Sequence, residues 1–233
     1  MEKSPPSVDV TGLTCHYGGH LAVDAIDLHI PAGVVTALVG HNGSGKSTVL
    51  MALAGLLRPS AGAIAGRPAD IAFVPQHSSA PDHLPITVRQ TVEMGRWRTT
   101  GPFGRLSRRD RRIVDDCLER LHISDLADRR LGGLSGGQRQ RTLVAQGLAQ
   151  KAPLLLLDEP LAGVDSQAVA LIGRAIGGVR SEGTTIVLAT HDQAQADSAD
   201  QVVRLRQGSV AEVRTRGREG GSEALTQHRR LLR

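Results

Sequence analysis

Cysteine is almost absent from this sequence, which contains two cysteines in 233 residues. Cys15 and Cys117 lie far apart and form no C-x-x-C pair, so neither a disulfide framework nor a zinc site is indicated. We expect both to be buried and to act as small apolar side chains. Most of the nine histidines likewise show no spacing typical of metal ligands.

Long apolar runs are missing too. Residues 1–6 contain no apolar segment that could act as a signal peptide, and no stretch of about 18 uncharged apolar residues occurs elsewhere. The hydrophobic content of 40% still suffices for the core of one large domain or of two small, closely joined ones. We therefore expect a soluble chain that stays in the cytoplasm.

Lysine is the rarer basic residue by far, because only three of the 28 lysine and arginine residues are lysines. One of them, Lys46, lies in a glycine-rich stretch between the apolar runs 34–39 and 49–53. This order predicts a strand, a loop and a helix. A compact ammonium group on a flexible stem fits between phosphate groups where a planar guanidinium would not, so lysine here indicates phosphate chemistry.

The glycine-rich stretch matches the phosphate-binding pattern G-x-x-x-x-G-K-[ST]. Its residues are Gly40, His41, Asn42, Gly43, Ser44, Gly45, Lys46, Ser47 and Thr48. The glycines let backbone N–H groups turn toward phosphate oxygens, and the following helix points its positive end at the same anion. We expect Lys46 to contact the β- and γ-phosphates and the hydroxyl of Ser47 to hold a Mg²⁺ ion.

The net charge of +5 comes from arginine clusters at 96–112 and 204–233. Such clusters are most often solvated surfaces. They also suit an anionic membrane surface, a partner protein or a nucleic acid, and charge alone does not choose among these.

Two short blocks of alternating apolar and polar residues, 8–14 and 21–30, begin the ordered part of the sequence. They predict antiparallel strands joined by a turn at 17–20. Tyr17, the one tyrosine, lies in this turn. It could stack on a base or pack against the edge of the sheet, and the sequence leaves both open.

Polar side chains follow several predicted strands at their carboxyl ends, where ligands collect in α/β sheets. Gln76 follows the short apolar run 71–75, and we expect it to reach a metal ion and the attacking water. The leucine-rich run 153–158 is typical of a central strand covered on both faces. It ends in Asp158, a candidate to hold Mg²⁺ through water, and is followed by Glu159, a candidate to polarise water for attack on the γ-phosphate.

A further buried strand is predicted at 184–190 and is followed by His191. A histidine at such a strand end is well placed to contact a γ-phosphate. Before this strand, 166–179 predicts a helix with Val169 among its inward-facing residues. A hairpin of two strands is expected within 202–213.

Residues 77–150 change in character and predict a helical insertion in an α/β domain. Helices are expected at 87–97 and 108–123, the second with an apolar stripe opposite a charged one. The breaker cluster 99–104 between them predicts a surface loop.

A second candidate anion site closes this insertion, where another helix begins. The residues at its start are Ser135, Gly136, Gly137 and Gln138. Ser135 is a good N-cap, and two glycines expose N–H groups at the helix start. The same pattern could be a plain loop-to-helix junction, and the residues alone favour neither.

The order of these elements predicts an α/β fold of the P-loop NTPase class. It has a central, mainly parallel sheet, an antiparallel β subdomain at the N-terminus and an inserted α-helical subdomain. We expect one ATPase domain at 1–213, with 1–76 and 151–213 as its core and 77–150 as the helical subdomain. Residues 214–233 are expected to form a basic, loosely ordered tail.

The ordered set of motifs resembles the ATP-binding cassette (ABC) ATPase family from residue 8 to about residue 213. Residues 40–48 match the Walker A loop, and 134–138 match the signature sequence of the family. The remaining matches are Gln76 as the Q-loop, 154–158 with Glu159 as the Walker B strand and catalytic glutamate, Asp165 as the D-loop, His191 as the switch histidine and Tyr17 as the adenine-stacking aromatic.

The resemblance implies a homodimer in which two such domains meet head to tail in the presence of ATP. Each ATP, with its Mg²⁺ ion, would lie between the Walker A loop of one copy and the signature of the other. Ser135, Gly136 and Gly137 would then contact the γ-phosphate bound by the partner copy. Loss of that phosphate on hydrolysis would open the dimer.

The resemblance also implies partners. A family member with one cassette and no membrane span is typically the motor of a transporter, bound to integral membrane permease subunits on the inner face of the cell membrane. The segments 83–88, 94–97 and 103–104 are similar to ATPases of bacterial zinc, manganese or iron-chelate importers. We therefore expect ATP hydrolysis to power import of a metal ion such as zinc or manganese, with an extracellular solute-binding protein taking part.

The alternatives are an iron-siderophore or haem importer ATPase, an exporter ATPase, and a non-transport ABC ATPase that acts on nucleic acid through the arginine clusters. Members of the last class usually carry coiled-coil insertions, zinc-binding cysteines or two cassettes, none of which this sequence shows, so no nucleic acid partner is expected. Glu159 and His191 argue against a nucleotide switch that lacks turnover.

Overall fold

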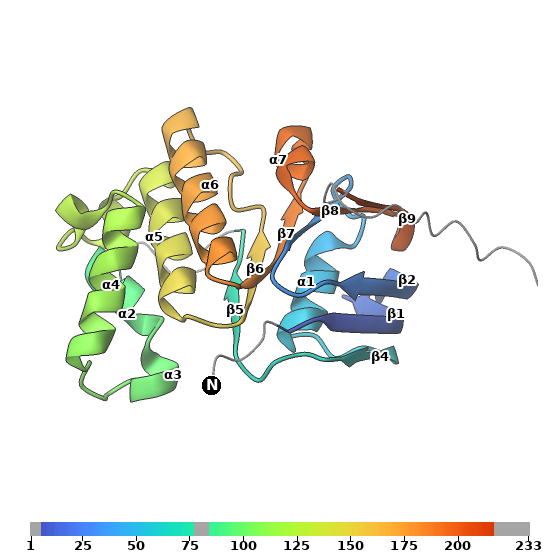
Figure 1. Cartoon of the computed structure of the whole chain (residues 1–233), viewed down its shortest axis with the longest axis horizontal. Coiled ribbons are helices and arrows are strands. Elements are labelled where there is room, and N and C mark those ends of the chain that lie inside the picture. Colours follow the sequence, from blue (N-terminus) through green and yellow to red (C-terminus); the bar gives the residue numbers. More distant parts are fainter. Residues whose placement is uncertain (1–5, 77–83, 217–233) are drawn as a thin grey trace, which may run out of the picture.

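The computed structural model describes residues 6–76 and 84–216, which form two sheets and a helical layer (Figure 1). The predicted fold class is confirmed, because a largely parallel sheet, an antiparallel sheet and a helical part are all present. No helix among the described residues is long and apolar enough to span a membrane. The loosely ordered tail expected from residue 214 begins later, because a strand continues to Thr215. The rest of the tail, from 217, and the expectations for 77–83 lie outside the described residues.

The central sheet has the strand order β5-β6-β7-β3-β8-β9. Its strands are β3 Val35–Val39, β5 Ile71–Val74, β6 Leu154–Asp158, β7 Thr185–Thr190, β8 Gln201–Arg206 and β9 Ser209–Thr215. Neighbouring strands run parallel except for β8 and β9, which form the expected hairpin. Every residue of β3, β6 and β7 is buried, as their nearly continuous apolar sequences require for strands covered on both faces.

The smaller sheet is antiparallel and has the order β2-β1-β4. Its strands are β1 Val8–Tyr17, β2 His20–Ile30 and β4 Ala61–Ala65. Helix α1 (Lys46–Ala54) joins the two sheets, since Leu50 and Leu53 belong to one buried cluster with Ile30 and Leu156. The sequence does not predict β4, because its small, largely exposed residues show no alternation and become a strand by pairing with β1.

A helical layer lies beside the central sheet, on the side away from α1 (Figure 1). Its helices are α2 Val88–Met94, α3 Trp97–Thr100, α4 Arg108–Arg120, α5 Gly136–Ala149 and α6 Ser166–Ser181, with short 3-10 turns at η1 Ser124–Leu126 and η2 Leu131–Gly133. Apolar residues of α2, α4, α5 and α6 form one buried cluster with β3, β5, β6 and β7. The short helix α7, Gln193–Ser198, follows β7.

Three sequence expectations for the helices need correction. The helix expected at 87–97 divides at Gly95, where a Cβ atom would lie 2.4 Å from the carbonyl oxygen of Gln146 on α5. The helix expected at 108–123 ends with Leu121 as its C-cap. Val169 of α6 was expected to face inward and is 38% exposed, because the buried stripe of α6 passes through Ile172 instead.

The expectation for the two cysteines is confirmed. Both Cys15 and Cys117 are buried and free. Burial away from water raises the pKa of the Cys117 thiol to about 12, so this thiol stays protonated and unreactive.

Arg96 joins three helices of the helical layer. Its buried side chain donates from Nε to Oδ1 of Asp110 on α4 at 2.9 Å, and from Nη1 to the carbonyl oxygen of Ala149 on α5 at 2.8 Å. Arg96 is also the N-cap of α3. The hydroxyl of Ser107 donates to Asp110 at 2.6 Å, and this hydrogen bond, with the Arg96 guanidinium, lowers the pKa of the Asp110 carboxyl.

The change Asp110→Asn should leave the buried Arg96 guanidinium without its counter-charge. We expect the free energy of unfolding at neutral pH to fall by about 3 kcal/mol, as is typical when one partner of a buried pair is removed. The folded pKa of Asp110 is depressed, so the carboxylate contributes stability above its unfolded pKa and loses that contribution as pH falls through its folded pKa. Urea unfolding should therefore show the difference between parent and variant shrinking in acid.

Asp115→Asn is the matched control on the same helix. Asp115 pairs with Arg89 at 2.7 Å, but both side chains are exposed to solvent. Loss of this exposed ion pair should lower the free energy of unfolding by at most about 1 kcal/mol. Equal losses in the two variants, or a loss in Asp110→Asn that persists undiminished at low pH, would contradict the role assigned to the Arg96–Asp110 pair.

Candidate nucleotide-binding site

The parallel pairing of the central strands brings the predicted site residues to one edge of the sheet. Residues aligned across neighbouring strands include Val39 with Thr190 and Asp158 with Ala189. The phosphate loop therefore begins beside His191, which follows β7, and Glu159, which follows β6. This common edge is the place where α/β sheets bind ligands.

Backbone geometry shapes the phosphate loop. Gly43 and Gly45 have φ angles of 77° and 104°, a left-handed region that glycine enters readily. At Gly45 a Cβ atom would lie 2.8 Å from the carbonyl oxygen of Ala22, so the loop packs directly on β2. The β8–β9 turn braces its other side, since the Gly208 N–H donates to the Ser44 carbonyl oxygen at 3.2 Å.

Helix α1 begins at Lys46 without a side-chain cap, because its N-cap is Gly45. The first N–H groups of the helix are thus left for a ligand, and the positive end of the helix dipole points the same way. The buried Ser44 Oγ also has no hydrogen-bond partner among the described residues. These donors suit a phosphate group, which accepts hydrogen bonds only.

The Lys46 ammonium lies in the centre of the site and is 5% exposed. Its Nζ donates to the carbonyl oxygens of Gly40 at 2.8 Å and His41 at 3.2 Å. It also lies 3.7 Å from Oε1 of Glu159. Lys46 is therefore held within the loop by the chain itself, with its charge balanced by one carboxylate.

Glu159 is the group on which the other predicted side chains converge. Its Oε2 lies 3.0 Å from Nδ1 of His191 and 3.5 Å from Nε2 of Gln76, and the side chain is 8% exposed. A carboxylate only accepts hydrogen bonds, so Nδ1 carries the proton. The backbone of Glu159 has a φ of 46°, unusual for a residue with a side chain, and its N–H bonds to the Ala189 carbonyl oxygen at 3.0 Å.

A cavity of about 420 Å³ follows the phosphate loop. It is lined by Tyr17, His20, Leu21, Ala22, Asn42, Gly43, Ser44, Gly45, Lys46, Ser47, Thr48, Gln76 and Glu159. Tyr17 stands at this cavity and is 61% exposed, so its ring is not packed away against the edge of the sheet. The size and the donors of the cavity fit a nucleoside triphosphate.

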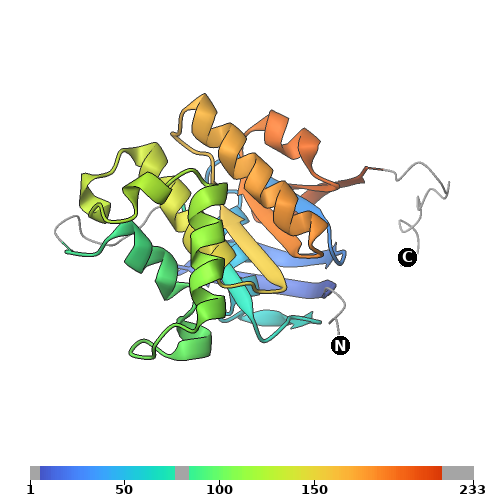
Figure 2. The same ribbon diagram turned by 60° about the vertical axis from the view of Figure 1, so that its left-hand side comes forward.

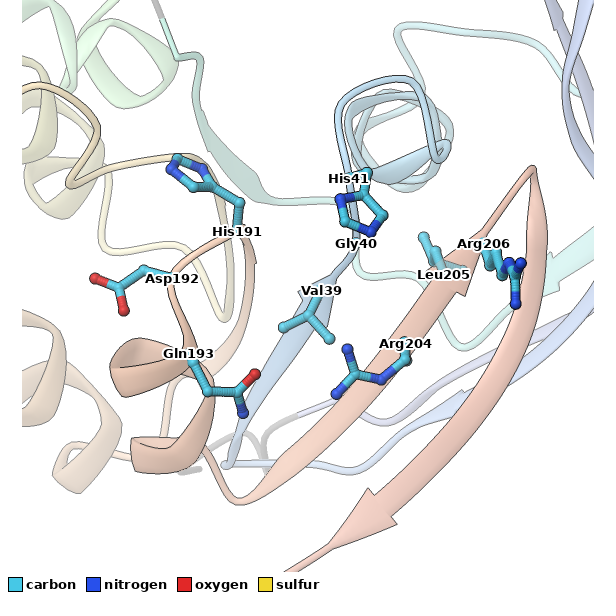
Figure 3. Close-up of a pocket in the computed structure, with 9 residues that line it drawn as sticks. All are labelled: Val39, Gly40, His41, His191, Asp192, Gln193, Arg204, Leu205 and Arg206. Carbon is cyan, nitrogen blue, oxygen red and sulfur yellow. The ribbon is translucent and has the colours of Figure 1, made fainter.

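A second cavity, of about 430 Å³, lies on the other side of the phosphate loop (Figure 3). His191, Asp192 and Gln193 line one side of it, and Arg204 and Arg206 of β8 lie on the other. No local sequence pattern connects these arginines with the phosphate loop. Arg204 becomes a neighbour of the phosphate loop only through the pairing of β8 with β3, which places it opposite Val39.

The signature residues lie apart from the two cavities at the phosphate loop. Ser135 caps α5, accepting a hydrogen bond from the Gln138 N–H at 3.3 Å, while the Gln138 side chain accepts from the Ser135 N–H at 3.0 Å. Gly136 is exposed, and a Cβ atom there would contact nothing within 4 Å. None of the residues 135–138 lines either cavity at the phosphate loop. One chain thus presents two helix starts suited to anions, on different surfaces.

Asp165 links the signature to the core of the same chain. Its Oδ1 accepts a hydrogen bond from the Ala168 N–H at 2.8 Å and so caps α6. Its Oδ2 lies 3.2 Å from the position of a Cβ atom at Gly137. A side chain at Gly137 would therefore press on Asp165.

A phosphate loop between β3 and α1, with polar side chains from β5, β6 and β7 around it, defines a P-loop nucleotide-binding protein. Residues 23–162 match the family model described as ABC transporter. The chain belongs to the ABC transporter family of ATP-binding proteins.

Two curated relatives are similar over most of their length. The manganese transport system ATP-binding protein MntB of Listeria monocytogenes is 37% identical over 212 residues, covering 88% of each chain. The zinc uptake system ATP-binding protein ZurA of Listeria innocua is 36% identical over 196 residues, covering 79% of this chain and 76% of the relative.

Two solved structures share the fold and more than a quarter of the sequence. A putative metal-chelate type ABC transporter in an inward-facing conformation is 30% identical, with a TM-score of 0.79, covering 91% of this chain and 83% of the other. A bacterial ABC transporter cassette solved as a dimer is 26% identical, with a TM-score of 0.79, covering 90% of this chain and 99% of the other.

The change Lys46→Ala should weaken ATP binding by about 100-fold, because it removes the two hydrogen bonds that the ammonium would donate to the β- and γ-phosphates, worth about 1.5 kcal/mol each. Equilibrium binding of a fluorescent ATP analogue measures this directly. Lys151→Ala is the control, since Lys151 pairs with Glu182 on the surface of the helical layer. Undiminished binding by Lys46→Ala, or equal weakening in both variants, would contradict the assignment of the loop.

Proposed function

We propose that this chain hydrolyses ATP to ADP and phosphate as the motor subunit of a metal-ion importer. The observation that carries the proposal is the convergence of Lys46, Gln76 and His191 on the buried carboxylate of Glu159, next to the phosphate loop. A site that only binds nucleotide has no need of a carboxylate held at the place where water would attack.

The phosphate loop, residues 40–48, would hold the triphosphate, and Tyr17 would stack on the adenine. Ser47 and Gln76 would hold a Mg²⁺ ion directly, and Asp158 would hold it through water. When bound, this ion neutralises charge that develops on the β- and γ-phosphate oxygens.

Glu159 would accept the proton of the attacking water. Its fixed backbone and its hydrogen bond from His191 aim the carboxylate before any substrate arrives, so little reorganisation is needed during the reaction. The His191 side chain is 61% exposed, so its ring could contact the γ-phosphate while it keeps its hydrogen bond to Glu159.

Two copies would be needed for a complete site. Ser135, Gly136, Gly137 and Gln138 lie outside the cavities of their own phosphate loop and would bind the γ-phosphate held by a partner copy in a head-to-tail homodimer. The bacterial cassette solved as a dimer supports the pairing of two copies. Hydrolysis would remove the shared phosphate and let the dimer open.

The transport partners follow from the relatives. Transport-system ATP-binding subunits act with an integral membrane permease, so this chain would sit on the inner face of the cell membrane beneath such a permease. An extracellular solute-binding protein would deliver the cargo. Manganese or zinc is the favoured cargo on the similarity to MntB and ZurA, and a metal chelate is the second candidate on the similarity to the metal-chelate transporter.

The change Glu159→Gln should remove the general base while keeping its size. We expect ATP turnover to fall at least about 100-fold, within the range typical of general-base catalysis, while ATP binding persists. The variant should form a dimer in gel filtration with ATP and Mg²⁺. Glu119→Gln, on the exposed face of α4, is the control and should retain parental turnover. Full turnover by Glu159→Gln, with no ATP-dependent dimer, would refute the role of Glu159.

The cargo can be tested in cells of the source organism. Deletion of the gene should reduce uptake of radioactive manganese or zinc, and uptake should return with the parental gene but not with the Glu159→Gln variant. Unchanged uptake of both metals, together with loss of uptake of a ferric chelate, would instead establish the second candidate. No change for any of the three would contradict the role as an importer.

A further inference from the structure

Residues 96–112 form a strongly basic end of the helical layer, which we call the basic tip. It contains seven arginines and one acidic residue, so its charge exceeds the +5 of the whole chain. It includes α3, the loop that follows, and the first residues of α4. In Figures 1 and 2 it lies at the lower edge of the helical layer.

Most arginines of the basic tip have no counter-charge. Arg96 is buried against Asp110, and Arg98 pairs with Asp70. The others are exposed and form no ion pair within residues 6–76 and 84–216: Arg105, Arg108, Arg109, Arg111 and Arg112. A cluster of like charges is thus presented to the surroundings.

Two large aromatic side chains share this end of the molecule. Phe103, in the loop before α4, is 100% exposed, and Trp97 at the start of α3 is 42% exposed. Each exposes apolar surface that neither the core nor a neighbouring helix covers. In a chain with one Trp and two Phe, this concentration marks a contact surface.

The stability of the fold does not account for the arginines. Helix α4 begins at Arg108, and four of its first five residues are arginines. The start of a helix carries partial positive charge, where cations are unfavourable. An external anion bound at this helix start would offset the repulsion between the arginines and the positive end of the helix.

We propose that the basic tip lies against the headgroups of an anionic phospholipid bilayer. Arginines near such a surface are each attracted to it, and exposed aromatic rings insert at the boundary between headgroups and acyl chains. The five main cavities among the described residues are lined neither by Phe103 nor by residues 105–112. A peptide anchor fills a pocket, and single-stranded nucleic acid follows a basic groove beside stacking aromatic rings, whereas a bilayer surface needs neither.

The contact would leave the nucleotide sites accessible. Arg96 joins the start of α4 to Ala149, the last residue of α5, whereas Arg141 near the start of α5 donates to the Leu121 carbonyl oxygen just past the end of α4. The two helices therefore run antiparallel, and Ser135 lies at the opposite end of α5 from the basic tip, roughly 20 Å away at the rise of an α-helix. The inference goes beyond the proposed function and does not depend on ATP turnover.

Vesicle sedimentation tests the proposal with the full-length chain and no nucleotide. One set of vesicles consists of phosphatidylcholine, and the other contains an equal part of phosphatidylglycerol. The parent should bind only the anionic vesicles, and binding should weaken as salt is raised. The triple change Arg108→Gln, Arg109→Gln and Arg112→Gln should reduce the affinity at least about tenfold, since each arginine near an anionic surface accounts for roughly fivefold.

The matched control removes three exposed arginines elsewhere, by Arg58→Gln, Arg129→Gln and Arg174→Gln. Both triple variants have the same net charge and the same basic tail, so only the position of the lost charges differs. The control should bind within about twofold of the parent. The tip variant should melt no lower than the parent, because cations have left the positive end of a helix.

Phe103→Ser supplies an independent variant, because this fully exposed ring supports no part of the fold. It should weaken binding to anionic vesicles about tenfold, as expected for one apolar side chain returned to water. Equal binding by the two triple variants, or equal binding of the parent to both kinds of vesicle, would overturn the proposal. Tip-dependent binding of a short duplex DNA without vesicle binding would also overturn it.

Discussion

The parallel pairing of β5, β6, β7 and β3 is the constraint on which the site depends, because it gathers the carboxyl ends of strands that are far apart in the sequence. Lys46, Gln76 and His191 reach one carboxylate, that of Glu159, only from this edge. A shift of one residue in the pairing of β6 would reverse the side chains of that strand and move Glu159 away from the other three. The buried strands leave no room for such a shift, and the left-handed backbone at Glu159 is held by the Ala189 carbonyl oxygen.

The helical layer carries the two proposed contact surfaces at its opposite ends. Arg96 ties α3, α4 and α5 together at the basic tip, and Ser135 begins α5 at the other end. Apolar residues of α5 belong to the same buried cluster as the central strands, so the position of the signature relative to the phosphate loop is set by the packing of that layer on the core. One phosphate-loop lysine and two helix starts suited to anions in a single chain are what the proposed head-to-tail dimer requires.

Much of the fold and of the candidate site could be predicted from the sequence, because strong local patterns encode them. The apolar runs before Lys46, Asp158 and His191 specify buried parallel strands, and the residues that follow them fall at one edge of the sheet. Two kinds of feature could not be predicted from the sequence. The edge strand Ala61–Ala65 exists through its partner alone, and Arg204 reaches the phosphate loop only through the pairing of β8 with β3. Both depend on contacts between distant segments.

Cross-linking between two differently labelled chains tests the head-to-tail composite site most directly. His41 and Gly136 are exposed, and the native cysteines are buried, so His41→Cys and Gly136→Cys can be made in separate chains that carry Glu159→Gln. The mixture should form a disulfide-linked dimer with ATP and Mg²⁺, and neither variant should do so alone. Cross-linking of each variant with itself, or none in the mixture with ATP, would contradict the composite site.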